Sequence, residues 1–324
     1  MYVLPLHAAK IVTSPSMSAP FSCKDKRMPG TIGLFLRSTD NDYQQRLKEL
    51  GVREAKKHGF ELLIESAQND PNRQVDQVRA AIKNASTTKL LAVLVSTVRD
   101  EGLPEVLREA AEAGIDCGLL NEGSFIDEVR AAYPSRAIFA VTSDQTEIGR
   151  IHGRQVRTLI GEKGQVLTVT GPMNTVMAQN RLAGLKEVLG NDFGVIELNA
   201  DWTSERARMA VERWADALGS SAELPGMFVA HNDEMALGVR QALRDVASKK
   251  ELPFAVTNIT GCDGSQTFGQ RLVKEGRIKA SVIMPPSSGA AIECIAKARN
   301  KGEMPPVRVM QPVTSYPSLG AIKR

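Results

Sequence analysis

Residues 226–247 read GMFVAHNDEMALGVRQALRDVA and contain one complete repeat of the pattern that decides the fold. The apolar run 226–230 has the length of a strand and no polar face, whereas 233–247 is a longer amphipathic segment. His231 and Asn232 separate the two. A strand that is apolar on both faces is typical of a parallel sheet covered by helices. The stretch therefore predicts a β-strand, a polar turn and an α-helix.

The same alternation runs along the chain from Thr31 and predicts an α/β fold. Ten strands in one open sheet would be large, so two smaller doubly wound parallel sheets fit 324 residues better. The longest polar connection, 121–136, places a first boundary directly after it. The expected strands are 31–36, 60–65, 90–95, 115–120, 137–142, 165–170, 194–198, 226–230, 254–259 and 279–283. The expected helices are 44–58, 72–85, one ending at Gly114, 145–160, 177–189, 204–218, 233–247, 265–275 and 288–299.

Composition excludes several classes of protein. Apolar residues make up 42% and charged residues 24%, which is ordinary globular usage, and a net charge of +4 does not by itself argue for nucleic acid. No apolar run approaches the roughly 20 residues of a membrane helix. Residues 1–30 match a secretory signal poorly and are expected to form a disordered leader. Cys117 and Cys294 lie in apolar runs and are predicted to be buried.

Polar side chains follow most of the expected strands. Ligands of open α/β sheets bind beyond the carboxyl ends of the strands, so these side chains are expected at one edge. Amides, carboxylates and flat aromatic rings suit a polyhydroxylated ligand, and the formal charges of Arg37, Arg181, Glu122 and Asp263 cancel, which favours a neutral one. Each residue has a structural alternative as a helix cap or turn residue, which we prefer for Asp233 and Ser265. The residues after the strands are 37–43, 96–97, 121–122, 171–174, 201–202, 231–233 and 261–264.

Recognised catalytic motifs are absent from the sequence. It contains no P-loop, no G-x-G-x-x-G, no G-x-S-x-G, no H-E-x-x-H and no calcium loop. His231 adjoins the candidate site but lacks an obvious nucleophile partner, and a general base must be positioned against the group that it activates. We therefore expect no enzyme activity, no catalytic residue, no cofactor and no metal site.

Three short motifs carry a resemblance to a known family. They are NDEMALG at 232–238, GCDG at 261–264 and RLAGL at 181–185, and QND at 68–70 followed by Gln74 adds a fourth similarity. The chain resembles periplasmic sugar-binding proteins of the ribose- and galactose-binding type, whose type I periplasmic binding protein fold is shared with effector domains of lactose-repressor-type regulators. The resemblance covers about residues 31–316.

The resemblance implies two discontinuous lobes joined by three crossings with a sugar bound between them. The crossings fall near Ser143, Met284 and Pro312. The N-terminal lobe then comprises 31–143 plus 285–312, and the C-terminal lobe comprises 144–284 plus 313–324.

The resemblance also implies ligand contacts. Arg181, Asn232 and Asp263 keep the residue types that the family uses on sugar hydroxyls, and Trp202 and Tyr43 stand where the family places aromatic rings. Gln44 replaces the second aromatic residue of the ribose type, and Asn121-Glu122 replaces its Asp-Arg pair, which argues against ribose and for another pentose, a hexose, a polyol or a modified sugar. The implied ligand-binding residues are Arg37, Tyr43, Ser96, Asn121, Glu122, Arg181, Trp202, Asn232, Asp263 and Met284.

The implied function is that of a substrate-binding protein of an ABC-type sugar importer. Hinge closure on the sugar would be read by a membrane permease, and the protein is expected to be a monomer in the periplasm, with a cytoplasmic location left open by the poor signal match. The alternative is the effector domain of a lactose-repressor-type regulator without its DNA-binding part. Residues 1–30 are too short and proline-rich for a helix-turn-helix, so we expect no nucleic-acid binding.

Overall fold

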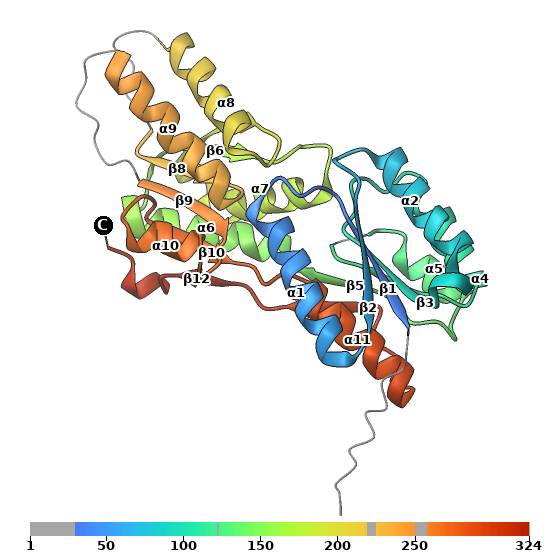
Figure 1. Cartoon of the computed structure of the whole chain (residues 1–324). Helices are drawn as coiled ribbons and strands as arrows, with labels where there is room; N and C mark the ends of the chain where they lie inside the picture. Colours follow the sequence, from blue (N-terminus) through green and yellow to red (C-terminus); the bar gives the residue numbers. More distant parts are fainter. Residues whose placement is uncertain (1–29, 122, 219–224, 250–257, 324) are drawn as a thin grey trace, which may run out of the picture.

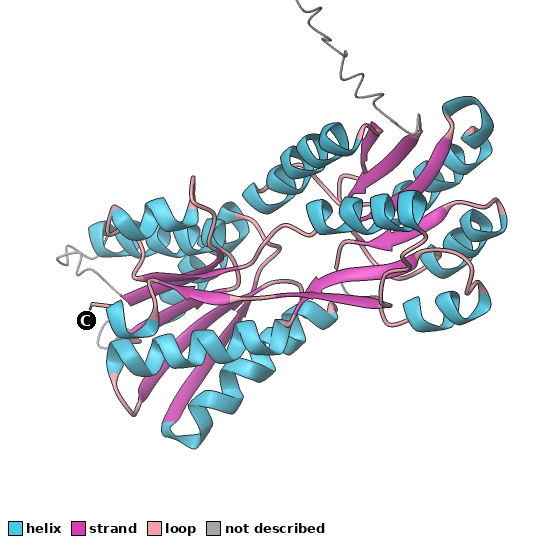
Figure 2. Ribbon diagram, turned by 90° about the horizontal axis from the view of Figure 1, so that it is seen from below, coloured by secondary structure: helices cyan, strands magenta, loops and turns pink. Residues whose placement is uncertain are grey.

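Two six-stranded sheets, each covered by helices on both faces, form the protein (Figures 1 and 2). The computed structural model describes residues 30–121, 123–218, 225–249 and 258–323, so nearly all of the expected leader lies outside the described residues. The predicted fold class, two α/β lobes with parallel sheets, is confirmed. Sheet A has the order β11 (Arg308–Gln311), β5 (Ile138–Ser143), β4 (Asp116–Leu119), β3 (Leu90–Val95), β1 (Thr31–Leu36) and β2 (Glu61–Ser66). Sheet B has the order β12 (Thr314–Tyr316), β10 (Ala280–Ile283), β9 (Asn258–Asp263), β8 (Met227–Ala230), β6 (Gly164–Thr170) and β7 (Phe193–Asn199).

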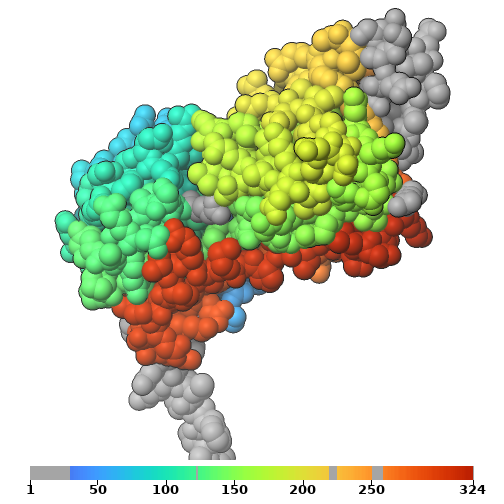
Figure 3. Space-filling view, turned by 180° about the vertical axis from the view of Figure 1, so that it is seen from behind, coloured from blue at the N-terminus to red at the C-terminus, as the bar shows by residue number. Residues whose placement is uncertain are grey.

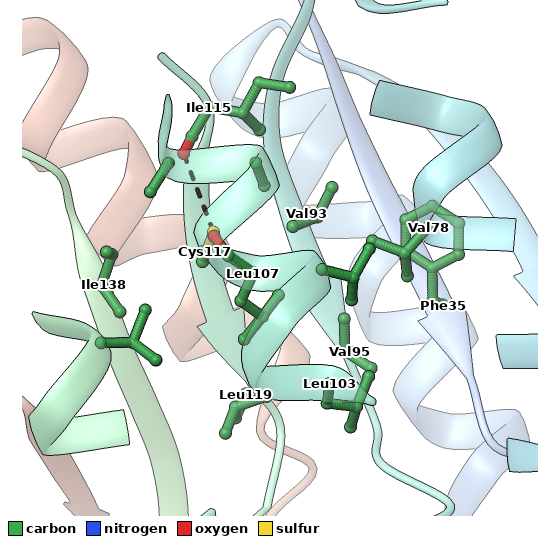
Figure 4. Close-up of a cluster of buried hydrophobic side chains, with 14 of the residues drawn as sticks. Phe35, Val78, Val93, Val95, Leu103, Leu107, Ile115, Cys117, Leu119 and Ile138 are labelled. Carbon is green, nitrogen blue, oxygen red and sulfur yellow. Dashed lines mark hydrogen bonds between the residues drawn. The ribbon is translucent and has the colours of Figure 1, made fainter. Parts of the chain in front are cut away.

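The strands of sheet A are parallel, and the central strands β1, β3, β4 and β5 are buried between two layers of helices. Phe35 and Cys117 point to the face covered by α2, α4 and α5, where the Cys117 thiol lies among apolar side chains (Figure 4). Leu34 and Phe139 point to the face covered by α1 and α11. This alternation explains why the central strands β1 and β3 are largely apolar on both faces. The helices are α1 (Asp42–His58), α2 (Pro71–Lys83), the short α3 (Ala85–Thr88), α4 (Leu103–Glu112), α5 (Ile126–Ala132) and α11 (Ser288–Lys301).

Sheet B is built in the same way, with α8, α9 and α10 on one face and α6 on the other. Helix α7 packs closely along α6. No described helix has the combination of length and apolar sequence that crossing a membrane requires. The elements are α6 (Gln145–Ile160), α7 (Val176–Leu189), η1 (Gly190–Asp192), α8 (Ser204–Ala217), α9 (Asp233–Lys249), α10 (Gly269–Lys274) and η2 (Leu319–Ala321).

The chain passes between the sheets three times. It leaves sheet A after β5, returns from β10 into α11, and leaves again between β11 and β12. Figure 3 shows the C-terminal residues, in red, running along both halves of the molecule. Strand β12 pairs with β10 in the antiparallel direction, whereas the other pairs in sheet B are parallel. These crossings bring the carboxyl ends of the parallel strands of both sheets toward each other.

Some expected elements require correction. The connection 121–136 contains α5, and β5 after it pairs with β4, so the boundary directly after residue 136 was wrong and sheet A continues to Ser143. The expected helix 265–275 is shorter, because Ser265 instead caps a turn by accepting a hydrogen bond from the Phe268 amide (3.1 Å). Strand β9 begins at Asn258 among the described residues, and 254–257 lie outside them. Cys294 is half-buried rather than buried, whereas Cys117 is fully buried as predicted.

Candidate functional site

One cavity lies between the strand ends of the two sheets, and we call it the ligand cavity. Nine of the ten predicted ligand-binding residues line it, although they come from distant parts of the sequence. The tenth, Glu122, lies outside the described residues. The nine are Arg37, Tyr43, Ser96, Asn121, Arg181, Trp202, Asn232, Asp263 and Met284.

Arg181 on α7 is the buried cation of the ligand cavity, with 3% of its surface exposed. Its Nε donates to Gln145 Oε1 (2.7 Å), and its two terminal nitrogens donate to the His231 carbonyl and to Met284 Sδ (3.4 Å). Among the described residues it forms no ion pair with a carboxylate within 4 Å. A buried guanidinium held by neutral acceptors keeps hydrogen-bonding capacity for a polar ligand, because it has five N–H donors.

Trp202 forms an aromatic wall beside Arg181, whose guanidinium carbon lies 5.5 Å from the ring centre. Its backbone has a φ of 57°, which a bulky side chain rarely adopts. The ring lies against Gly171, where a Cβ atom would come within 2.2 Å of it. The buried indole Nε1 has no hydrogen-bond partner among the described residues. An unpaired buried N–H is costly, so a ligand acceptor at this position would stabilise the site.

Asn232 and Asp263 add amide and carboxyl groups from sheet B. Asn232 Oδ1 accepts from the Met235 amide (2.7 Å) as the cap of α9, and its Nδ2 donates to the Trp202 carbonyl (2.9 Å). Asn232 is therefore both a helix cap and a residue that lines the cavity. Asp263 has a φ of 94°, and burial together with nearby Asp233 raises the pKa of its carboxyl well above the usual value. Backbone strain of this kind concentrates at ligand sites.

Tyr43 on α1 packs against apolar clusters of both lobes. Its ring packs against Met284 and the apolar cluster around Cys262, as well as against the core of its own lobe. Burial raises the pKa of its hydroxyl to about 12, and a side-chain hydrogen bond with Ser287 opposes that shift. The phenol is therefore neutral and able to donate or accept a hydrogen bond.

The other described residues that were predicted from the N-terminal half form hydrogen bonds with neighbouring residues. Both atoms of the Asn121 amide are engaged by Thr97, including a 3.1 Å bond from the Thr97 amide to Asn121 Oδ1. Ser96 Oγ lies 3.3 Å from Gln44 Nε2. Arg37 Nε donates to Asn69 Oδ1 (3.2 Å). The structure thus places these residues at the cavity but shows scaffold roles for Asn121 and Ser96.

Nine further residues line the cavity without having been predicted as ligand-binding. Gln145 is the most informative, because it holds Arg181 and directly follows the first crossing. Its position three residues after the expected strand 137–142 was a usable signal. Gln311 lies on β11, which the apolar pattern did not identify as a strand. The nine are Asn41, Gln44, Leu120, Thr142, Ser143, Gln145, Met177, Ser287 and Gln311.

Asp233 stabilises the turn at Gly264. This agrees with the prediction of a structural rather than a ligand-binding role, although Asp233 does not cap its own helix. Its oxygens accept from the Gly264 amide (2.8 Å) and the Ser281 hydroxyl (2.6 Å). Burial raises the pKa of this carboxyl to about 7, although both hydrogen bonds lower it. The Asp233 carboxyl is thus neutral in acid, and above about pH 7 it ionises although it is buried.

We predict that Asp233→Asn removes a pH-dependent loss of stability. A carboxyl whose pKa is raised on folding makes its full contribution to the free energy of unfolding when the pH is below the pKa of the unfolded chain, near 4. That contribution is lost as the pH rises from there through the folded pKa of about 7. The free energy of unfolding of the variant, relative to the unchanged protein, should therefore increase with pH in this window, by at most about 1.4 kcal/mol per pH unit. Urea unfolding at several pH values measures it, with exposed Asp216→Asn as control. Parallel pH profiles for the two proteins would contradict the prediction.

His231 is a structural residue in this arrangement. Its Nδ1 accepts a hydrogen bond from the Gly171 amide (3.2 Å). Burial and the nearby Arg181 hold its pKa well below the usual value, so the imidazole is neutral. Across the described ranges, no three His, Cys, Asp or Glu side chains are grouped so that they could hold a metal ion.

Two α/β lobes with a polar cavity between their strand ends define a two-lobed small-molecule-binding protein. The chain belongs to the family described as periplasmic binding protein domain, whose model matches residues 32–301. The resemblance seen in the sequence motifs is thereby confirmed.

Relatives match over nearly the full chain at modest identity. The galactofuranose-binding protein YtfQ of Escherichia coli (strain K12) is 23% identical over 312 residues, covering 95% of this chain and 94% of the relative. The ribose import binding protein RbsB of Salmonella typhimurium is 26% identical over 298 residues, covering 91% and 93%.

A solved structure supports the fold. The crystal structure of a galactofuranose binding protein superposes with a TM-score of 0.77 at 22% identity, covering 89% of this chain and 94% of that one. At this identity the match establishes the fold and not the ligand.

Proposed function

We propose that this protein is the sugar-binding component of an ABC-type importer and holds a neutral monosaccharide or polyol in the ligand cavity. One observation carries the proposal. The buried Arg181, Asn232, Asp263 and Trp202 from the lobe of sheet B line one cavity together with Tyr43 from the lobe of sheet A. The relatives named above are a ribose import binding protein and a galactofuranose-binding protein, which supports import over the regulator alternative.

Each group has a distinct part in the proposed binding. Arg181 and Asn232 donate to sugar oxygens, and Asp263 bonds a pair of hydroxyls. Trp202 and Tyr43 cover the apolar faces of the ring. We also assign ligand contacts to Arg37, Ser96, Asn121 and Met284, which line the cavity, and to Glu122, which lies outside the described residues.

The sugar is proposed to bridge two lobes that close around it. We assign 31–143 plus 285–312 to one lobe and 144–284 plus 313–324 to the other. Outside the crossings, the Asp42 amide donates to Glu234 Oε1 (2.7 Å) and Arg46 donates to the Asp263 carbonyl (3.4 Å). These interlobe bonds favour the closed form, and a ligand that contacts both lobes shifts the equilibrium further toward it.

We propose that a membrane permease recognises the closed form. We place the protein in the periplasm, in keeping with the description of its family, and we expect it to be a monomer. We assign no catalytic residue, because the neutral imidazole of His231 is hydrogen-bonded to the Gly171 amide and, within the part of the chain that the structure describes, to no nucleophilic side chain. Gln44 and Asn121 replace an aromatic residue and an aspartate of the ribose type. We therefore propose that the ligand is another pentose, a hexose, a polyol or a modified sugar.

Calorimetry against pentoses, hexoses and polyols tests the proposal. At least one compound should bind with 1:1 stoichiometry and a Kd on the order of micromolar, about −8 kcal/mol. Amino acids and nucleosides serve as controls. Binding of one of these controls, together with no detectable binding of any sugar or polyol, would contradict the sugar-binding function.

A further inference from the structure

A second pocket, which we call the outer pocket, lies at the mouth of the cleft beside the ligand cavity. It is formed by the loops that follow β1, β2 and β3 in one lobe, and by the loops that follow β6 and β7 together with α8 in the other. Strands β2 and β7 form the sheet edges opposite the crossings, so this pocket is on the side of the molecule away from them. Its charged side chains are Arg37, Arg99, Arg206, Arg213 and Asp201.

The arginines of the outer pocket are not neutralised by the protein. Among the described residues, none of the four forms an ion pair with a carboxylate within 4 Å. Elsewhere on the surface Arg79, Arg150 and Arg308 each have such a partner. Arg99 and Arg206 also lack a hydrogen bond from their guanidinium groups to any described residue. The residues that line the pocket carry four guanidinium groups and one carboxylate, which is an excess of positive charge even with Asp40 close to Arg37.

Arg37 connects the outer pocket to the ligand cavity, because it lines both. Its Nε is fixed by Asn69, whereas its terminal nitrogens have no hydrogen-bond partner among the described residues. Burial lowers the pKa of this guanidinium, and the carboxylates of Asp201 and Asp40 only partly offset the shift. A further anionic group near Arg37 would favour its charged form.

We propose that the outer pocket binds an anionic substituent, a carboxylate or a phosphate, on a sugar whose ring lies in the ligand cavity. The inference rests on the proposed sugar-binding function and extends the ligand beyond the neutral ring. Guanidinium groups recognise both anions through paired N–H donors, which lysine cannot reproduce. The substituent leaves the ring past Arg37 and meets Arg99 and Arg206 from opposite lobes, so its binding also favours closure.

Matched sugars test the proposal by calorimetry. The pairs are ribose with ribose 5-phosphate, arabinose with arabinose 5-phosphate, and galactose with galacturonate and with galactose 6-phosphate. At low ionic strength, at least one anionic member should bind about tenfold or more tightly than its neutral parent. The preference should shrink at high ionic strength, because this pocket is open to solvent. The uronate and phosphate arms distinguish the two kinds of anion.

A double variant, Arg99→Gln with Arg206→Gln, should abolish the preference for the anion. Neither side chain lines the ligand cavity, so affinity for the neutral parent should change by less than about twofold. The control is Arg53→Gln with Arg271→Gln, which removes the same charge from α1 and α10 and should keep the preference. If neutral parents bind at least as tightly as all their anionic partners, only the outer-pocket proposal fails. If no sugar in either form binds, the sugar-binding function fails with it.

Discussion

Replacing Arg181 by methionine is expected to weaken binding of the sugar identified by calorimetry by roughly a hundredfold or more. The guanidinium is buried in the ligand cavity, yet its protein partners are the neutral Gln145, the His231 carbonyl and Met284. Its remaining N–H donors therefore meet a ligand in a place where water is scarce. Charge-assisted hydrogen bonds contribute more than neutral ones in such surroundings, so their loss has a large effect.

Arg181→Lys is the matched comparison for this variant. Lysine keeps the charge but loses the planar fork, so it should recover only part of the affinity. Thermal unfolding of both variants establishes that the fold persists, and Trp214, which lies outside the cavity, provides a fluorescence probe of the folded core. Binding by Arg181→Met that equals binding by the unchanged protein would remove Arg181 from the site.

The second large effect is expected from Gly149→Ala on α6. A Cβ atom at Gly149 would lie 2.0 Å from the Arg181 carbonyl oxygen, and one at Gly184 would lie 2.0 Å from the Thr146 carbonyl oxygen. The two helices therefore touch through their backbones, and a methyl group at either glycine must push them apart. Overpacking of this kind costs about 3 kcal/mol of unfolding free energy. Because α7 carries Arg181, ligand affinity should fall as well.

Urea unfolding and calorimetry measure the two consequences separately. Gly184→Ala should reproduce both, since it separates the same helices from the other side. Gly194→Ala is the control, because its Cβ would meet nothing closer than Gln165 Cγ at 3.7 Å and its φ is not positive. Wild-type stability of Gly149→Ala would show that the helix pair adjusts without strain.

Much of the fold could be predicted because its strands are buried on both faces. Their apolar runs, separated by amphipathic segments, predict a doubly wound sheet before any pairing is known. The helix 145–160 was predicted with the boundaries that the structure shows. Strands β11 and β12 were missed because only partly buried or exposed residues form them, so they carry no apolar run. The helix α5 was missed because it is short and lies inside a polar connection.

The candidate site could be located from the sequence but its internal contacts could not. Strand ends meet at one edge by topology, which is why Arg181's neighbours Asn232 and Asp263 were found together. The sequence could not show that Thr97 engages the amide of Asn121, because that bond depends on the distance between two adjacent loops. Nor could it show the left-handed backbone at Trp202, which follows from the tertiary position of the ring over Gly171.

The interleaved sheets also constrain the order in which this protein can mature as it leaves the ribosome. Helix α11 and strand β11 complete one face and one edge of sheet A, yet they are made after β6 to β10 of sheet B. Until Ile292 and Ile295 emerge, the apolar side chains Leu34 and Phe139 lack part of their cover. The first half to be synthesised therefore stays incomplete until most of the second half has been made, and a nascent chain paused before residue 288 should be a substrate for chaperones that bind exposed apolar surface.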